Sequence, residues 1–415
     1  MSWTKRAVRG SQCAVLVVMM SLAAVASAQQ QGAVDISAKH IASLPADLSK
    51  AVVETTMRTH PEAKDLGKWG YTQALYLNGE YLVYERTHDP RYLAYIKSWA
   101  DANVDAQGRI NRKITALDYM LPGNIMLILY HETGEAKYKA AATEIWDTLT
   151  TNYPRTEDGG FWHATTRQHQ LWLDGTYMSL PFVVHYGEAF GKQKYAYDEA
   201  SKQLLIYASH LNDPKSGLLF HAYDESGVQK WADPVTHHSS FFWARSIGWY
   251  GMALIDVLEK MPADHPNRPK LIALVRQLVQ AYARYQDPKT GLWYNVVNKP
   301  KQPGNWLETS ASSMYIYTIS KAVERGYVPK KYEKVACKGY RGVLGELSVD
   351  ANGGVDIANI CIGTNVGDLQ FYLDRPRRTN DEHGLGAFLI MNEQMRNAPC
   401  VVKMRAKAAK AAKTK

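Results

Sequence analysis

The stretch that decides the fold is Gly159-Gly160-Phe161-Trp162-His163, followed by Trp172-Leu173-Asp174-Gly175, because both parts recur along the chain. The first part begins with Gly and ends with a residue that carries a polar ring or an amide. The second part consists of Trp, any residue, a charged residue and a small residue. Two further copies are Gly217-Leu218-Leu219-Phe220-His221 with Trp243-Ala244-Arg245-Ser246, and Gly291-Leu292-Trp293-Tyr294-Asn295 with Trp306-Leu307-Glu308-Thr309. Recurrence of this kind indicates one structural unit used several times.

Apolar residues at helical spacing lie between these motifs, and we find no run of alternating strands. The helical patterns cover Tyr71 to Tyr84, Tyr92 to Val104, Tyr119 to His131, Tyr138 to Asn152, Thr176 to Tyr186, Tyr195 to Leu211, Phe241 to Met261, Pro269 to Tyr285, Ser310 to Arg325 and Gly384 to Met395. The chain is therefore predicted to be all-α. No low-complexity linker divides it, which favours a single domain.

The charged residues of the repeat are Asp118, in a weaker first copy, Asp174, Arg245 and Glu308, which are 56, 71 and 63 residues apart. Such a spacing fits two helices with their connections, that is, a helical hairpin. Six hairpins fit the length and would close into an (α/α)6 barrel, a toroid of six helical hairpins. In that ring the four charged residues are expected at one rim.

The composition is that of a globular protein. Of 415 residues, 46% are hydrophobic and 11% aromatic. The chain has 26 Tyr and 11 Trp against 8 Phe. Amphipathic rings in such numbers suit clefts that face sugars, although many will be core.

The first residues have the pattern of a secretory signal peptide. Lys5, Arg6 and Arg9 precede an apolar run over 14–26, and Ala26-Ser27-Ala28 forms an A-x-A cleavage site. The apolar run is shorter than the ~20 residues of a spanning helix. We therefore expect residues 1–28 to be removed, no membrane anchor, and export to the periplasm or beyond the cell.

The net charge of +9 is concentrated at the two ends of the chain. The signal carries three basic residues and the tail 403–415 carries six, with no acids in either, so the remainder is neutral. A neutral body argues against a nucleic-acid partner. We predict a catalytic domain over 29–402 and a tail over 403–415 that is disordered or a frayed helix, with contact to an acidic polymer or membrane surface as the lesser alternative.

Cysteine spacing fits no metal motif. Cys13 leaves with the signal, so Cys337, Cys361 and Cys400 remain. In an oxidising compartment one disulfide and one free thiol are expected, and the spacing does not say which pair forms.

Asp174 lies between large aromatics and beside a glycine. Aromatic walls exclude water, which should raise its pKa and suit it to act as a general acid near neutral pH. The alternative is that Asp174 caps a helix beginning at Gly175.

The predicted rim combines carboxylates, the imidazoles of His163 and His221, Arg245 and several Trp, as in a carbohydrate site. Arg245 offers a planar fork for a carboxylate, so an acidic sugar is the natural ligand. The alternatives are a structural pair of Arg245 with Glu308 or Asp118, and hydrogen-bonded core roles for the histidines. With no Gly-rich phosphate loop, no Gly-x-Ser-x-Gly motif and no Cys beside a credible base, carboxylate acid/base catalysis remains.

These residues also carry a family resemblance. The segments 172–178, 242–249, 307–311, 363–368 and 380–384 resemble those of glycoside hydrolase family 105, the unsaturated rhamnogalacturonyl hydrolases, which are related to the unsaturated glucuronyl hydrolases of family 88. The likeness covers roughly residues 50–395.

The resemblance implies an (α/α)6 barrel and a hydration reaction without metal or cofactor. The substrate would be an oligosaccharide made by a polysaccharide lyase, with a 4,5-unsaturated galacturonate at its non-reducing end, and the enzyme would be a monomer. By position, Asp174 matches the general acid/base and Asp118 its partner carboxylate. The positions that match substrate-binding residues are His163, Trp172, His221, Trp243, Arg245 and Trp249.

Three other functions remain open. The substrate could be an unsaturated glucuronide from ulvan or a glycosaminoglycan. A toroidal sugar epimerase would use a His pair as acid and base. A sugar-binding toroid without catalysis is the third.

Overall fold

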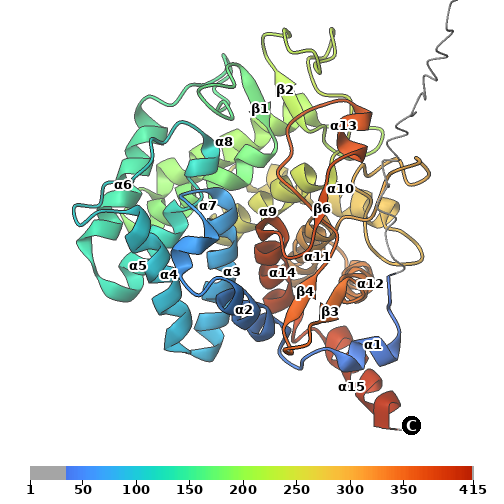
Figure 1. Cartoon of the computed structure of the whole chain (residues 1–415). Helices are drawn as coiled ribbons and strands as arrows, with labels where there is room; N and C mark the ends of the chain where they lie inside the picture. Colours follow the sequence, from blue (N-terminus) through green and yellow to red (C-terminus); the bar gives the residue numbers. More distant parts are fainter. Residues whose placement is uncertain (1–33, 414–415) are drawn as a thin grey trace, which may run out of the picture. The chain divides into compact units, whose positions relative to one another are not determined.

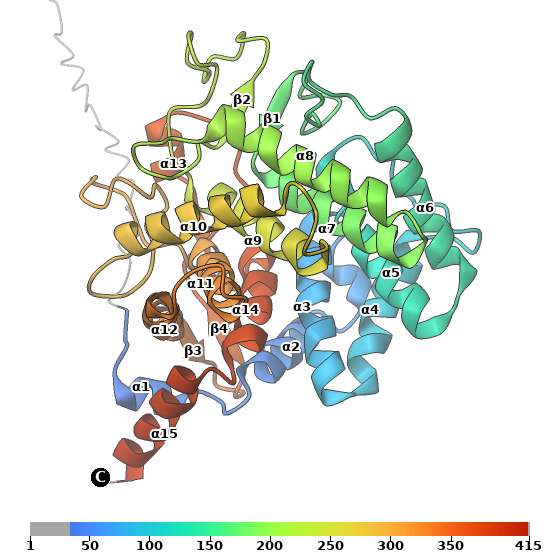
Figure 2. The ribbon, with the colours of Figure 1, turned by 180° about the vertical axis from the view of Figure 1, so that it is seen from behind.

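Twelve helices pair as six hairpins in the computed structural model, which describes residues 34–413 (Figure 1). The inner helices are α3 (Tyr71–Thr87), α5 (Gly123–Thr133), α7 (Asp174–Ala189), α9 (Ala244–Lys260), α11 (Thr309–Glu324) and α14 (Glu382–Met395). The outer helices are α2 (Leu48–Thr59), α4 (Pro90–Asn103), α6 (Ala136–Thr151), α8 (Gln193–Leu211), α10 (Arg268–Tyr285) and α12 (Glu333–Leu344), of which α8 and α10 are in front in Figure 2. The predicted all-α fold of six hairpins is confirmed.

The inner helices form a closed ring. Each packs against the next, and the last, α14, packs against the first, α3. Small residues permit this closing contact: a Cβ at Gly386 would lie 2.5 Å from the backbone of Leu75, and one at Gly79 would lie 2.7 Å from Cβ of Leu389. At these two glycine positions the neighbouring helix lies so close that it leaves no room for a side chain.

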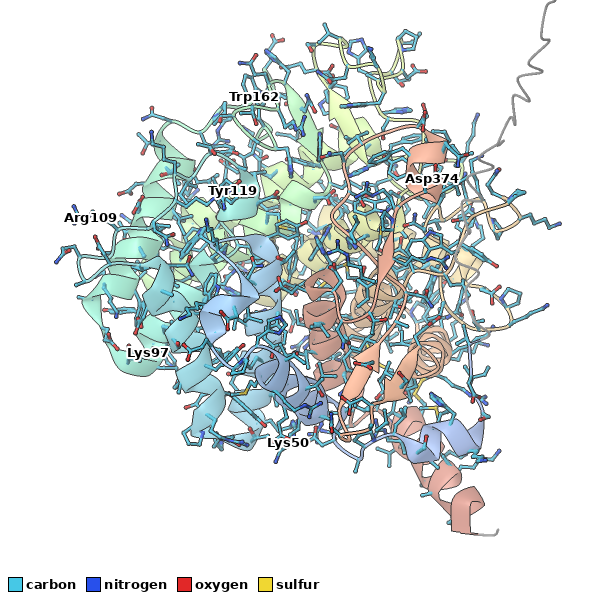
Figure 3. All side chains as sticks on the ribbon, viewed as in Figure 1. Lys50, Lys97, Arg109, Tyr119, Trp162 and Asp374 are labelled. Carbon is cyan, nitrogen blue, oxygen red and sulfur yellow. A yellow bond between two sulfur atoms is a disulfide. The ribbon has the colours of Figure 1, made fainter. Side chains whose placement is uncertain are left out.

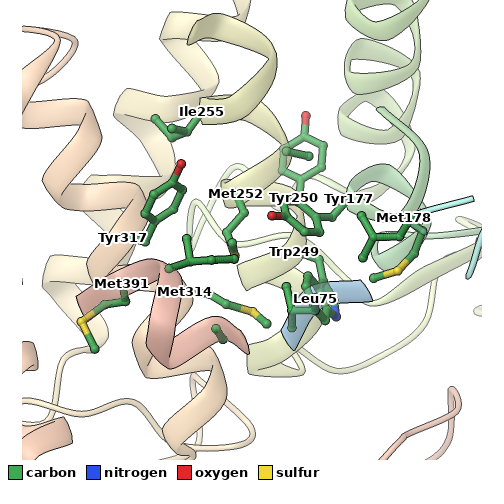
Figure 4. Close-up of a cluster of buried hydrophobic side chains, with 14 of the residues drawn as sticks. Leu75, Tyr177, Met178, Trp249, Tyr250, Met252, Ile255, Met314, Tyr317 and Met391 are labelled. Atoms are coloured by element: carbon green, nitrogen blue, oxygen red, sulfur yellow. The ribbon is translucent and has the colours of Figure 1, made fainter. Parts of the chain in front are cut away.

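The interior of the ring is a continuous apolar core (Figure 4). Its side chains come from different inner helices, among them Leu75 on α3, Tyr177 on α7, Trp249 on α9 and Met314 on α11. The Trp249 ring stacks on that of Tyr177 with centroids 5.2 Å apart. This core holds the beginnings of the inner helices in fixed positions.

Short strand pairs lie in the connections. Strand β1 (Gln170–Trp172) pairs antiparallel with β2 (Ala222–Asp224), β3 (Leu347–Val349) with β4 (Val355–Ile357), and β5 (Ile360–Cys361) with β6 (Arg377–Arg378). In the first pair Leu171 is opposite Tyr223, so the loops that precede α7 and α9 are joined directly. Four short helices lie in the connections, η1 (Ala63–Leu66), η2 (Leu117–Tyr119), η3 (Lys330–Tyr332) and α13 (Leu369–Leu373), and a fifth, α1 (Ala38–Ser43), precedes the first hairpin.

Each of the ten predicted helical patterns coincides with a helix, but α2 and α12 have no predicted counterpart. Helix α12 contains Gly339 and Gly342, which weaken a helical pattern. Both glycines are needed by packing, since a Cβ at Gly342 would lie 2.4 Å from the carbonyl oxygen of Thr290. Tertiary contact therefore overrides local propensity there.

The basic tail is helical where the structure describes it, which agrees with the helix and not with the disorder that were both considered from the sequence. Helix α15 (Pro399–Lys413) packs against α1 and α12. Its Val401 and Ala408 are buried, and Arg405 donates hydrogen bonds to the carbonyls of Pro45 and Ala46. A disulfide joins Cys337 of α12 to Cys400 of α15, while Cys361 is a buried free thiol.

The predicted signal peptide, residues 1–28, lies outside the described residues. Within 34–413, no helix combines the length and the apolar character that crossing a membrane requires.

Candidate active site

A cavity of about 340 Å³ opens at the end of the barrel where the inner helices begin. Tyr119, on its wall, is labelled in Figure 3. The other residues that line it are Tyr71, Thr115, Ala116, Asp118, His163, Ala164, Thr166, Arg167, Trp172, Asp174, Met178, Gly363, Thr364 and Asn365. Four of the predicted site residues, Asp118, His163, Trp172 and Asp174, are among them.

Two carboxylates face this cavity, and each has a histidine beside it. Asp118 lies in η2, with Oδ1 3.7 Å from Nε2 of His163. Asp174 is the first residue of α7, with Oδ2 3.2 Å from Nε2 of His221. The ring of Trp172 stacks on that of His163 with centroids 4.5 Å apart. The site is thus built from two acid–imidazole pairs that share an aromatic wall.

His221 is held from behind by a residue distant in sequence. Its Nδ1 lies 2.8 Å from the hydroxyl oxygen of Tyr372, on α13, and that oxygen also accepts a hydrogen bond from the backbone N–H of Gly367. His163 and His221 are both buried, as the core interpretation expects. Each nevertheless directs one ring nitrogen at a carboxylate of the site.

The two carboxyl groups have pKa values displaced in opposite directions. Burial and the charge of Asp174 raise the pKa of Asp118, although His163 and Arg112 oppose this. Burial alone would raise the pKa of Asp174, but the charge and hydrogen bond of His221, together with His163, outweigh it and lower the pKa. The prediction that the pKa of Asp174 is raised is therefore wrong. The prediction considered only the aromatic neighbours in the sequence, whereas His221, from the loop of the next repeat, lowers the pKa.

Asp174 does not cap its helix. The N-cap position of α7 is occupied by Leu173, and no side chain caps that end. Its carboxylate is left to face His221 and the cavity.

Arg245 lies behind the cavity wall and is 1% exposed. Its guanidinium donates to the carbonyl oxygens of Cys361 and Ile362 and lies over the ring of Trp243, 4.8 Å from the centroid. It thereby holds the segment that continues into Gly363, Thr364 and Asn365 on the cavity wall. The guanidinium was predicted to bind a substrate carboxylate, but in the structure its N–H groups donate to carbonyl oxygens of the protein. The contact of Arg245 with substrate therefore stays a prediction.

Glu308 is a structural residue. It caps α11 by accepting hydrogen bonds from the backbone N–H groups of Ser310 and Ala311, and it also accepts one from Cys361. The hydroxyl of Ser310 donates to Glu308 and accepts from Arg245. Glu308 and Arg245 therefore meet through Ser310 and Cys361.

Trp243 and Trp249 are also buried behind the wall rather than lining the cavity. The Nε1 of Trp243 donates to Oδ1 of Asn295, and Trp249 packs between Tyr177 and the edge of Tyr71. Their predicted contact with substrate stays untested. In this arrangement they support the residues that do line the cavity.

A further group, formed by Tyr71, His383 and Asp381, was given no role from the sequence, although 380–384 is one of the segments that carry the family resemblance. The hydroxyl oxygen of Tyr71 lies 2.6 Å from Nε2 of His383, whose Nδ1 lies 2.5 Å from Oδ1 of Asp381. Burial and the charge of Arg245 lower the pKa of His383 to about 4. Tyr71 begins α3 as Asp174 begins α7, so its position in the repeat was the available signal.

Among residues 34–413, the group of side chains close enough to share a metal ion is Glu333, Cys337 and Cys400. The two sulfurs of that group are joined in the disulfide, so the thiolates that a metal would need are not available there.

The chain matches known carbohydrate-active proteins over most of its length. The model of the family described as Glycosyl Hydrolase Family 88 matches residues 48–398. The solved structure of a family 105 glycoside hydrolase from C. acetobutylicum is 34% identical, covers 84% of this chain and 99% of that chain, and superposes with a TM-score of 0.81.

Two more distant relatives have named activities. The unsaturated rhamnogalacturonyl hydrolase YesR of Bacillus subtilis is 23% identical over 72% of this chain and 80% of its own length. The structure of an unsaturated glucuronyl hydrolase from Bacillus sp. GL1 is 13% identical, covers 85% of this chain and 96% of that chain, and has a TM-score of 0.64. The latter likeness concerns the fold alone.

Proposed function

The chain belongs to glycosyl hydrolase family 88, with family 105 enzymes among its structural relatives, and we propose that it releases 4,5-unsaturated galacturonate from the non-reducing end of rhamnogalacturonan oligosaccharides. It is a glycoside hydrolase of the unsaturated uronyl type. The observation that carries the finer proposal is the pair of carboxylates in one cavity, each beside an imidazole. The name of the relative YesR supports the choice of sugar.

In the proposed reaction Asp174 acts twice. Protonated Asp174, whose Oδ2 lies 3.2 Å from Nε2 of His221, delivers its proton to C4 of the C4=C5 double bond. The carboxylate then takes a proton from the water that attacks C5. The resulting hemiketal opens, C1 becomes a hemiacetal, and the aglycone leaves. One water is consumed and Asp174 is protonated again at the end.

The other lining residues orient the substrate. Asp118, with its raised pKa, holds a proton more readily than an exposed aspartate and so places less negative charge beside the acidic sugar. Arg167 lies at the cavity and 5.3 Å above the ring of Trp172, where it can face the uronate carboxylate. The side chains of Thr115, Thr364 and Asn365 supply hydrogen bonds for sugar hydroxyls.

The variant Asp174→Asn tests this assignment. Incubated with lyase-generated rhamnogalacturonan oligosaccharides, it should lose roughly 10²–10⁴-fold in the rate at which the ultraviolet absorbance of the double bond disappears, because acid/base catalysis contributes about that much. Binding, measured by calorimetry, should persist. Asp264→Asn, at an exposed site remote from the cavity, is the matched control. Full activity in Asp174→Asn would remove the role given to Asp174.

The same assay separates the alternatives. Oligosaccharides from ulvan or a glycosaminoglycan, tested in parallel, identify a glucuronyl hydrolase. Isomerisation of a reducing sugar without loss of absorbance identifies an epimerase, and binding without either reaction identifies a sugar-binding protein.

We also propose that the protein acts after export. The signal pattern of residues 1–28 supports this, as does the disulfide between Cys337 and Cys400, since disulfides persist in oxidising compartments. Cell fractionation of the native host with detection of the N-terminus at Gln29 is the test.

A further inference from the structure

A second cavity, of about 620 Å³, has a strongly basic lining. Lys64, Lys68 and Arg112 line it together with Trp69 and Asn111, and we call it the basic groove. No acidic side chain is among its lining residues. Nothing in the proposed reaction uses it.

Two chain segments connect the basic groove to the active-site cavity. One runs from Trp69 in the groove to Tyr71 in the cavity, and the other from Arg112 in the groove to Thr115 and Tyr119 in the cavity. The groove and the cavity are therefore neighbours on the same face of the barrel.

The wall between them is rigidly built. Trp69 Nε1 donates to the carbonyl oxygen of Tyr119 at 2.8 Å. Arg112 donates to the carbonyl of Trp69 and to the hydroxyl of Tyr119, and its guanidinium lies 3.9 Å above the Tyr119 ring. A ligand in the cavity that extends past Tyr119 reaches Arg112 first.

The charges of the groove are only weakly compensated by acidic side chains, of which Asp118 is near enough to interact with Arg112. Within the described residues, Lys68 and Arg112 form no ion pair, and Lys64 pairs with Glu62 at 3.6 Å where both side chains are exposed. Exposed pairs of that kind are weak and readily exchanged. Three cations on one concave surface favour an anionic ligand.

We propose that the basic groove binds an anionic group, a carboxylate or a sulfate, on the aglycone of the oligosaccharide whose terminal uronate occupies the active-site cavity. The inference rests on the proposed function, since a fragment of an acidic polysaccharide carries charged groups on more than its terminal sugar. Lys68 and Arg112 contact the anion, and Asn111 offers an amide to neighbouring hydroxyls. The groove thus selects longer acidic substrates over short or neutral ones.

The double variant Lys64→Gln/Lys68→Gln tests the groove without disturbing Arg112, which supports the cavity wall. With a lyase-generated unsaturated tetrasaccharide, KM should rise roughly three- to ten-fold, in line with two exposed charge contacts. With the unsaturated disaccharide, which lacks the further sugars that are proposed to reach the groove, KM and kcat should be unchanged. Added salt should raise the wild-type KM for the tetrasaccharide toward that of the variant.

Lys113→Gln is the matched control, because it removes an exposed lysine beside Arg112 that does not line the groove. Equal KM values for the tetrasaccharide in the wild type, the control and the double variant would overturn the proposal.

Calorimetry with saturated tetrasaccharides separates failure of the groove from failure of the proposed function, because it needs no hydrolysis. The binding of a carboxylated and of a sulfated tetrasaccharide is compared to identify the anion that the groove prefers. A neutral tetrasaccharide is measured as the reference. Weaker binding of an acidic ligand to the double variant supports the groove even if no unsaturated substrate is cleaved. Identical binding of acidic and neutral ligands to the wild type would contradict it.

Discussion

Tyr372 is a positioning residue for the Asp174–His221 pair. Its hydroxyl group lies 2.8 Å from Nδ1 of His221, within hydrogen-bond distance, and its oxygen accepts a hydrogen bond from the backbone N–H of Gly367. Loss of a partner by a buried polar group costs about 1–3 kcal/mol. Tyr372→Phe should therefore loosen the orientation of His221 toward Asp174 and lower kcat about ten-fold with little change in KM. Because His221 lowers the pKa of Asp174, the limb of the kcat/KM profile that reports Asp174 should shift to higher pH in the variant.

A merely structural role for Tyr372 predicts a different result. The variant would then lose thermal stability but keep the pH profile of the wild type. Unchanged limbs in a profile measured over several pH values would contradict the positioning role.

At this scale the sequence located residues better than it described their surroundings. Asp118, Asp174, His163 and His221 were found because equivalent positions of a repeat meet at one end of a toroid. The partner of Arg245 could not be found, because Cys361 lies 116 residues further along the chain and contributes a backbone carbonyl, which no side-chain pattern reveals. The direction of the pKa shift at Asp174 was missed for another reason, because the repeat places His221 at the same rim but does not say which carboxylate its ring faces.

The contact between α3 and α14 depends on Gly386. A Cβ there would lie 2.5 Å from backbone atoms of Leu75, which cannot move aside as a side chain can. Gly386→Ala should lower the free energy of unfolding by about 2 kcal/mol through overpacking. Urea unfolding followed by tryptophan fluorescence measures this.

Helix propensity alone predicts the opposite sign for Gly386→Ala, since alanine in a helix interior is favoured by about 0.5–1 kcal/mol over glycine. A variant more stable than the wild type would show that the helices separate at little cost. The comparison thus decides whether packing or propensity dominates at the closing contact.

Helices as elements were well predicted where one face is apolar over several turns, as in α9 and α10. The strand pairs were not, because two or three residues, such as Ile360 and Cys361 of β5, are too short for an alternating pattern. Their partners are also distant, as with Cys361 opposite Arg377.

The stability of the whole molecule should depend on Asp256, on α9 toward the end opposite the active site. Burial raises its pKa to about 6, although the hydroxyl of Tyr317, which donates to it at 2.7 Å, and Lys321 oppose the shift. Because the folded pKa exceeds the unfolded value, the folded state binds the proton more tightly. The contribution of protonated Asp256 to the free energy of unfolding is therefore fully present below about pH 4, and it is lost as the pH rises through about 6.

Asp256→Asn should remove this dependence. Above pH 7 the variant should be more stable than the wild type by up to about 2 kcal/mol, after allowance for partial exposure, and the two should converge near pH 4. Urea unfolding between pH 4 and pH 8 measures the difference. Burial raises the pKa of Glu382 to about 7, but its contribution to the pH dependence is the same in both proteins and cancels in the comparison. Parallel curves over that range would contradict the prediction.

The closing contact between α3 and α14 also bears on how the protein folds. It joins residues about 300 positions apart, and contacts of such long range form slowly because a long loop must first be closed. The active-site cavity takes Tyr71 from the first helix of the ring and the segment 363–365 from just before the last. During refolding, catalytic activity should therefore return with the slowest kinetic phase, after most helical signal has recovered.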